Sequence, residues 1–368
     1  MIAYLHSLVV VFRADASAEI GTGHMMRSLA LAQRIVEQGG RAIFVMGHVS
    51  LQMRKRLEEE RCEVFQMTAR LYGWDDVQEL AIIAKENNAG WVFIDGYHFD
   101  AEYQRLCKKL GLRFVFVDDF GHADHYFADI ILNQSLYAHK DLYRNREPYT
   151  RLLLGNRYVL LRKEFLHSTH IHTQIPQEAK HILVTLGGAD ISNVTRTVIE
   201  TIHTIRSRDI ETIVVVGGSN PNMSALQTLI AASPVPMQLL FDVRNMSQLM
   251  EWADLAVSAG GTTCYELAYM GVPTIALIIA DNQVEFAERM DAAGHIKNLG
   301  RPILLTEGKL ADELERMILR QCVREEMIRR QAGLVDGKGV ERILMQLHKD
   351  MRGSIATANH EMCVHASM

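Results

Sequence analysis

The sequence predicts an α/β protein built from two successive Rossmann-like, doubly wound domains, and two observations support this. Short apolar runs rich in β-branched residues recur along the chain, and each run is continuous, as in parallel strands that are covered on both faces. Longer amphipathic stretches lie between the runs, which produces repeated βα units. At about 100–200 residues per domain, the 368 residues are enough for two such domains.

The first half of the chain contains five of these apolar runs, with helical patterns between them. Strands are predicted at residues 8–12, 42–45, 91–94, 114–117 and 130–132, and two of the helices at residues 25–38 and 77–87. These units predict a first domain over residues 1–165.

The second half repeats the pattern. Strands are predicted at residues 182–186, 212–216, 238–241, 255–258 and 274–279, with a helix at residues 194–205 among others. Residues 166–180 lose this periodicity and contain Pro176, which predicts a linker. The second domain is then expected over residues 181–350, and residues 351–368 are expected to be disordered. A cleft between the domains, which the carboxyl ends of the strands face, is the expected ligand site.

Composition excludes several classes of protein. The net charge of −5 comes from interspersed acidic and basic residues, so bulk charge does not favour nucleic acid. The five cysteines are scattered and contain no Cys-x-x-Cys pair, which argues against a disulfide framework and a cysteine zinc site. The longest later uncharged run, residues 267–280, has 14 residues and is too short to span a membrane. We expect a cytoplasmic monomer with no membrane insertion.

The loop after the first predicted strand is the first candidate site. It contains Asp15, Gly21, Gly23 and His24, and a helix with Arg27 in its first turns follows. Glycines permit a tight turn and close approach of a ligand, and a helix N-terminus offers N–H groups to an anion. Histidine ionises near neutral pH, so His24 is a candidate general base. A glycine loop that serves packing alone is the alternative.

The second domain has similar loops. One contains Gly188, Asp190 and Asn193, and another contains Gly260, Gly261 and Thr262, with Glu266 one turn into the next helix. Loop N–H groups suit a diphosphate, and a carboxylate one turn along can accept both hydroxyls of a ribose. A glycine turn beside a solvated glutamate is the alternative. Asp281, Asn282 and Gln283 follow the next strand, where the cleft is expected.

Aspartates also end two strands of the first domain, at Asp95-Gly96-Tyr97 and at Asp118-Asp119. They either face a ligand or cap the following helices. The sequence has no Asp-x-Asp motif, and His167, His170 and His172 of the linker lack a carboxylate or cysteine partner nearby. We therefore predict that the protein uses neither a metal nor another cofactor.

Several of these stretches together resemble the nucleotide-sugar hydrolases of the pseudaminic acid pathway and, more distantly, the lipid II-forming N-acetylglucosaminyl transferases. The matching residues occur in family order from Arg13 to about Leu347. They are Arg13-Ala14-Asp15, Ile20 to His24 with Arg27, Asp95-Gly96-Tyr97, Asp118-Asp119, Asn133, Leu161 to Phe165, Leu186 to Asp190, Gly260 to Glu266, and Asn282-Gln283. The resemblance implies the two-domain GT-B fold.

The resemblance also implies an activity and a set of roles. Family members hydrolyse UDP-2,4-diacetamido-2,4,6-trideoxy-β-L-altropyranose to UDP and the free sugar, by attack of water and inversion at the anomeric carbon. His24 matches the catalytic base, and Tyr97 and Asn282 match residues that line the sugar and water site. Glu266 and the Gly260 to Thr262 loop match the uridine and diphosphate site. The residues after Arg352 match nothing in the family.

Two other functions stay open on the sequence. The protein is either a hydrolase, a UDP-sugar glycosyltransferase of the same fold in which His24 deprotonates an acceptor hydroxyl, or a nucleotide-sugar binding protein without turnover. The identity of the diacetamido sugar is also open, because relatives in spore-coat polysaccharide synthesis share most of these motifs.

Overall fold

The computed structural model describes residues 8–16, 21–168, 175–188, 190–206, 209–217, 220–306 and 308–349. These residues form two compact units. The first unit comprises the described parts of Met1–Asp15, Arg27–Leu160 and Gly337–Met368, and the second comprises those of Ala16–Met26 and Leu161–Asp336. The predicted disorder of residues 351–368 concerns a segment outside the described residues.

The first unit contains a seven-stranded sheet in the order β3-β2-β1-β4-β5-β6-β7, and its paired strands are parallel. The order reverses between β1 and β4, which is where ligands bind in doubly wound sheets. The strands are β1 (Val9–Ala14), β2 (Arg41–Met46), β3 (Glu63–Gln66), β4 (Trp91–Asp95), β5 (Phe114–Val117), β6 (Ile130–Asn133) and β7 (Arg151–Leu154).

Helices cover this sheet because its strands are apolar on both faces. Val11, Ile43 and Val92 pack with residues of α3 and α4. On the other face of the same strands, Phe12 stacks on Phe44. The helices are α1 (Gly23–Glu37), α2 (Leu51–Glu59), α3 (Trp74–Glu86) and α4 (Ala101–Lys109), with short 3₁₀ turns η2 (Lys140–Tyr143) and η3 (Asn156–Tyr158).

The second unit contains a six-stranded parallel sheet in the order β10-β9-β8-β11-β12-β13. The strands are β8 (His181–Thr185), β9 (Glu211–Val216), β10 (Met237–Phe241), β11 (Leu255–Ala259), β12 (Thr274–Leu277) and β13 (Lys297–Asn298). The order reverses between β8 and β11, so the two units repeat one architecture. The predicted α/β fold class is confirmed.

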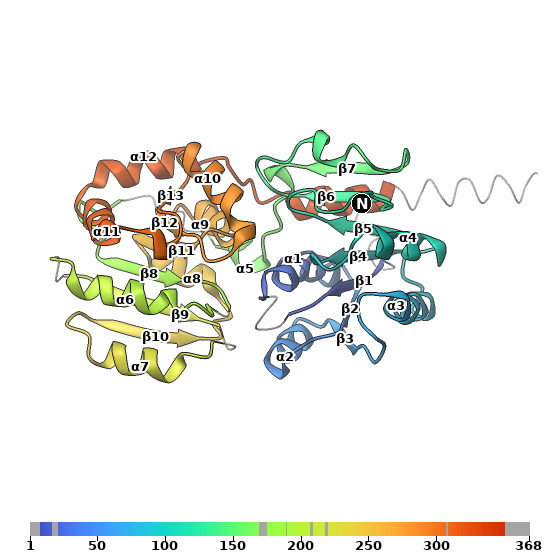
Figure 1. Cartoon of the computed structure of the whole chain (residues 1–368), viewed down its shortest axis with the longest axis horizontal. Helices are drawn as coiled ribbons and strands as arrows, with labels where there is room; N and C mark the ends of the chain where they lie inside the picture. The colour runs from blue at the N-terminus through green and yellow to red at the C-terminus, as the bar shows by residue number, and fades with distance from the viewer. Residues whose placement is uncertain are drawn as a thin grey trace, which may run out of the picture. The chain divides into compact units, whose positions relative to one another are not determined.

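Helices lie on both faces of the second sheet as well (Figure 1). Residues of α6, α7, α11 and α12 pack on one face, and residues of α5, α8 and α9 pack on the other. Their bounds are α5 (Lys163–Leu166), α6 (Val194–Thr204), α7 (Met223–Ala231), α8 (Met246–Trp252), α9 (Thr263–Met270), α10 (Val284–Ala292), α11 (Lys309–Leu319) and α12 (Gln321–Gln331), with 3₁₀ turns η4 (Asp281–Gln283) and η5 (Pro302–Leu304).

The two units divide the chain differently from the predicted boundaries at residues 165 and 350. Phe165 is fully buried among Leu183 and Met250 of the second unit, so the second unit begins before the predicted linker. The helix at residues 339–349 packs on the first unit instead of the second, because Trp91 Nε1 donates to the carbonyl of Leu347 over 3.3 Å. An ion pair between Arg34 and Glu341 supports the same placement.

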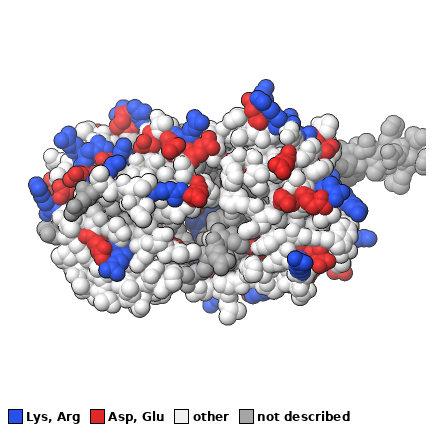
Figure 2. Space-filling view, in the orientation of Figure 1, with Lys and Arg blue, Asp and Glu red and all other residues white. Residues whose placement is uncertain are grey.

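The surface agrees with the charge pattern of the sequence. Figure 2 shows basic and acidic side chains interspersed over the visible face. Within the described part of the chain, none of the helices combines the length and the apolar composition needed to cross a bilayer.

Candidate functional site

Asp15 lies just beyond β1 and accepts hydrogen bonds from residues of two other loops. One of its oxygens, Oδ1, accepts the backbone N–H groups of Gly47 and His48 over 2.7 and 3.1 Å, and Oδ2 accepts the Tyr72 hydroxyl over 3.0 Å. Arg13 Nη1 lies 2.8 Å from Oδ2. The structure thus gives Asp15 a structural role in the first unit, and direct contact with a substrate stays a prediction.

Arg13 itself is a buried cation that was not predicted as a site residue, although it lies in a stretch that matched the family. Its guanidinium donates to both oxygens of Asp76, over 3.1 and 2.8 Å, and both side chains are fully buried. The Tyr103 hydroxyl donates to the same carboxylate over 2.6 Å. A charged residue at the end of an otherwise apolar strand was the signal in the sequence, because a buried charge needs a paired partner.

Arg27 lies in α1 and is also buried. Its Nε and Nη2 donate to the two oxygens of Asp95, each over 2.6 Å, and its Nη1 donates to Asp119 Oδ1 over 2.7 Å. Burial by itself lowers the pKa of Arg27, but the charges of Asp119 and Asp95 outweigh it and raise the pKa well above its ordinary value. This side chain therefore stays charged at any working pH.

Tyr97 belongs to the same group of residues. Its hydroxyl donates to Asp119 Oδ2 over 2.6 Å, and its ring packs against those of Phe120 and His122. Asp95 ends β4, and Asp119 follows β5, so the carboxyl ends of neighbouring parallel strands bring these residues together. Arg27 and Tyr97 were both predicted as site residues, and in the structure both donate hydrogen bonds to the Asp119 carboxylate.

Asp118 makes a separate set of contacts and does not join the Arg27 group. Its oxygens accept the backbone N–H groups of Phe120 and Gly121, each over 2.9 Å, and the hydroxyl of Tyr126. His122 Nδ1 lies 3.4 Å from Asp118 Oδ1. Burial by itself lowers the pKa of His122, but the hydrogen bond and charge of Asp118 raise it above its ordinary value.

We expect this pair to make stability depend on pH. A histidine whose pKa is raised by folding stabilises the protein fully below its unfolded pKa, and the contribution is lost as pH rises through the folded pKa. The variant His122→Gln should therefore be more destabilised relative to the wild type at pH 6 than at pH 8.5, in urea unfolding at each pH. An equal difference at both pH values would contradict a charged His122–Asp118 pair. The exposed variant His139→Gln is the control.

The predicted glycine turn leads into α1. Gly21 has a φ of +79°, which glycine adopts without strain, and a Cβ at this position would meet no atom within 4 Å. Gly23 is the first residue of α1 and His24 the second. The His24 side chain is buried, with 8% of its surface exposed. The roles of Gly21, Gly23 and His24 at a ligand stay predictions.

Glu266 lies in the first turn of α9 and is held by a cation. Arg162 donates to Glu266 Oε1 through Nε and Nη2, over 3.2 and 3.0 Å, and its Nη1 lies 2.7 Å from Glu164. Both Arg162 and Glu266 are largely buried, with 6% and 16% of their side chains exposed. The structure therefore excludes the alternative of a solvated glutamate, whereas contact with a ribose stays a prediction. Arg162 was missed as a site residue, although it lies in a stretch that matched the family.

The Gly260–Gly261–Thr262 turn joins β11 to α9 and approaches the next loop closely. A Cβ on Gly260 would lie 2.9 Å from the Cβ of Ala287 in α10, and one on Gly261 would lie 3.8 Å from Gln283 Nε2. Gln283 Oε1 accepts the N–H of Ile279 over 3.0 Å. The structure thus brings together the predicted residues of this turn and Gln283. Asn282 precedes Gln283 in η4 and is exposed.

Asp190 caps α6. Its two oxygens accept the N–H groups of Val194 and Thr195, each over 2.8 Å, which satisfies two of the donors that a helix N-terminus leaves open. Asn193 precedes α6 in the left-handed conformation. Gly188 lies close to Thr22, since a Cβ built on Gly188 would be 3.1 Å from Thr22 Oγ1. These contacts organise the loop, and its role in substrate binding stays a prediction.

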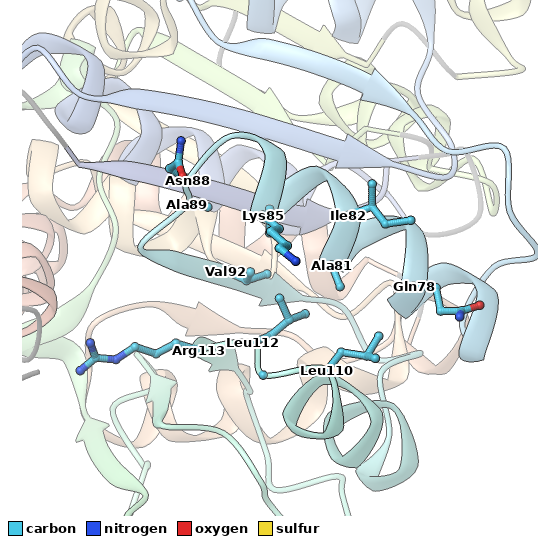
Figure 3. Close-up of a pocket in the computed structure, with 12 residues that line it drawn as sticks. Gln78, Ala81, Ile82, Lys85, Asn88, Ala89, Val92, Leu110, Leu112 and Arg113 are labelled. Carbon is cyan, nitrogen blue, oxygen red and sulfur yellow. The ribbon is translucent and has the colours of Figure 1, made fainter. Parts of the chain in front are cut away.

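A surface pocket of about 720 Å³ lies elsewhere in the first unit (Figure 3). It is lined by α3 and by the segments that lead into β4 and β5, with Lys85 and Arg113 as its basic residues. These segments enter the amino ends of the strands, whereas the predicted site residues follow the carboxyl ends. None of the predicted site residues lines this pocket.

Comparison with known proteins gives several relatives at low identity. The chain is 24% identical to the UDP-2,4-diacetamido-2,4,6-trideoxy-beta-L-altropyranose hydrolase of Campylobacter jejuni, over 78% of this chain and 97% of the relative. It is 23% identical to the spore coat polysaccharide biosynthesis protein SpsG of Bacillus subtilis, over 90% and 95%. It is 25% identical to the uncharacterized protein MJ1062 of Methanocaldococcus jannaschii over 72% of this chain, and it spans about half (54%) of that relative.

Solved structures share the fold. MurG of Acinetobacter baumannii superposes with a TM-score of 0.61 at 15% identity, over 93% of this chain and 99% of MurG. Anabaena HepE in complex with UDP-glucose gives 0.60 at 13% identity, over 94% of this chain and all of HepE. Residues 181–343 match the glycosyltransferase family 28 C-terminal domain. The chain therefore has the GT-B fold, and most of the residues that match the glycosyltransferase family 28 C-terminal domain lie in its second unit.

Proposed function

We propose that the protein hydrolyses a UDP-linked 2,4-diacetamido-2,4,6-trideoxy sugar to UDP and the free sugar, in the biosynthesis of pseudaminic acid. The observation that carries this proposal is Glu266, which Arg162 holds beside the Gly260–Gly261–Thr262 turn within the family 28 domain. A carboxylate beside a glycine turn suits the ribose and the diphosphate of a nucleotide. The similar hydrolase of Campylobacter jejuni suggests the sugar and the reaction class.

The proposed chemistry uses groups that the chain itself provides. Cleavage of the glycosyl–phosphate bond builds positive charge on the sugar ring and negative charge on the departing UDP. N–H groups at the start of α9 stabilise the negative charge. His24 takes a proton from the attacking water, which contributes a factor of about 10²–10⁴. Tyr97 and Asn282 position the sugar and the water, and attack by water inverts the anomeric carbon.

A UDP-sugar glycosyltransferase is the second candidate, because the match to the glycosyltransferase family 28 C-terminal domain favours it. In that case His24 would deprotonate an acceptor hydroxyl instead of water. We also propose that the enzyme acts as a cytoplasmic monomer.

The test is incubation with a small panel of UDP-diacetamido sugars in the absence of any acceptor. If the protein is a hydrolase, it should release UDP. NMR of the first sugar anomer formed should show that the configuration at the anomeric carbon is inverted. Release that requires an added alcohol would favour the transferase, and binding without turnover would indicate a sensor. Retention of the anomeric configuration would contradict direct attack by water.

We expect turnover to be independent of metal ions. In the described residues, no group of three or more His, Cys, Asp or Glu side chains is arranged to hold a metal ion, and helix N-termini can stabilise the leaving group. UDP release should therefore continue at its full rate in excess EDTA. Loss of activity that Mg²⁺ or Mn²⁺ restores would contradict this, and Asp118, Asp119 and Asp281 would be the first ligands to test.

A further inference from the structure

Two adjacent carboxylates in the first unit each accept a tyrosine hydroxyl. Asp118 accepts Tyr126, and Asp119 accepts Tyr97 over 2.6 Å. The two tyrosines differ in their surroundings. Tyr126 is 1% exposed. Tyr97 is partly exposed and follows the carboxyl end of β4. Of the two residues, Tyr97 is therefore the one that a ligand can approach.

The contacts of Asp119 determine the direction of the Tyr97 hydroxyl. An ionised carboxylate only accepts hydrogen bonds, so the proton of Tyr97 points at Asp119 Oδ2. Arg27 donates to the other oxygen over 2.7 Å and is itself held by Asp95. The backbone carbonyl of Asp119 accepts Asn133 Nδ2 over 3.0 Å. Asp119 is therefore anchored on both its side chain and its main chain.

We propose that Asp119 is a positioning residue that makes Tyr97 a hydrogen-bond acceptor toward the sugar. Because the phenolic proton is directed to Asp119, the oxygen of Tyr97 presents lone pairs to the ligand. The group that it recognises is then a donor, an acetamido N–H or a hydroxyl of the sugar, and not a carbonyl. This inference rests on the proposed function and assigns Asp119 and the Arg27 ion pair a part in substrate specificity.

The isosteric variant Asp119→Asn tests the direction of the bond. Arg27 can only donate, so the oxygen of the introduced amide must face Arg27 and its NH₂ group must face Tyr97. The hydroxyl would then accept from the amide, and its own proton would turn toward the sugar. Two donors would face each other, and we expect the KM for the UDP-sugar to rise by about 10-fold or more, with a smaller change in kcat. The Kd for UDP alone should not change.

Tyr97→Phe is the second variant and should raise KM to a similar extent. The double variant should be no worse than either single variant, because both remove one interaction. Asp124→Asn, which removes an exposed carboxylate of the same loop, should leave KM unchanged. If the effects of the two single substitutions on KM added in full in the double variant, Asp119 would act independently of Tyr97. That result would overturn the proposal.

A second measurement does not depend on turnover. In protein labelled with [¹³Cζ]tyrosine, the Tyr97 resonance is identified by its loss in Tyr97→Phe, and its shift reports whether the hydroxyl donates to a carboxylate. Asp119→Asn should shift this resonance and Asp124→Asn should not. An unshifted resonance in Asp119→Asn overturns the inference even if UDP release is intact. A wild-type protein that releases no UDP but shows the expected shift contradicts the proposed function and supports the assigned direction of the Tyr97 hydroxyl.

Discussion

Replacing His24 with alanine is expected to lower kcat by about 100-fold or more, the typical contribution of a general base. His24 is buried at the start of α1, whereas UDP is predicted to bind at the Gly260 to Glu266 segment. The affinity for UDP should therefore stay nearly unchanged. The measurements are steady-state kinetics of UDP release and calorimetry with UDP.

The pH profile gives an independent check of the same role. A base must be neutral to accept a proton, so the acidic limb of the kcat profile should be present in the wild type and absent in His24→Asn. The exposed His139→Asn is the matched control and should retain both kcat and the profile. Near-normal kcat in His24→Ala, or loss of UDP binding in parallel with turnover, would give His24 a structural or nucleotide-binding role. Tyr97 would then be the next candidate.

The second large effect is expected at Glu266. Removal of a charged hydrogen-bond acceptor costs about 1.5–3 kcal/mol, so Glu266→Ala should weaken UDP binding by roughly 10- to 150-fold. Arg162 retains Glu164 as a partner in this variant, and the fold should survive. Calorimetry with UDP is the measurement.

Two comparisons make the Glu266 experiment specific. Glu266→Gln retains one acceptor oxygen and should lose less affinity than Glu266→Ala. Glu288→Ala removes an exposed carboxylate of α10 and should bind UDP as the wild type does. Unchanged affinity in a folded Glu266→Ala protein would rule out the ribose site at this position and require another site for the nucleotide.

The sequence was most informative about the elements of the two sheets that are buried on both faces. Continuous apolar runs predicted β1, β4 and β5 because central parallel strands must be apolar on both sides. The edge strands β3, β7 and β13 were not predicted, since their residues are mostly not fully buried. Residues 339–349 were included in the second domain, because the sequence alone does not show on which unit a segment packs.

In the candidate site, too, some features could be predicted from the sequence and others could not. Gly21, with its positive φ, and the turn before Glu266 could be recognised from residue types and their spacing. The partners of the charged residues could not, because Arg27 meets Asp95 and Asp119 from 68 and 92 positions away in the chain, and Arg162 meets Glu266 from 104 positions away.

The sequence by itself determined the α/β class, the two repeated sheets and the loops in which polar side chains gather. Only the tertiary structure decided that Asp15 holds loops together, that Asp119 joins Arg27 to Tyr97, and that Arg162 holds Glu266. The physical reason is the distance along the chain between the interacting residues. Periodicity and turn chemistry act between near neighbours in the chain, whereas a buried charge is paired with whichever opposite charge the packed sheet brings beside it.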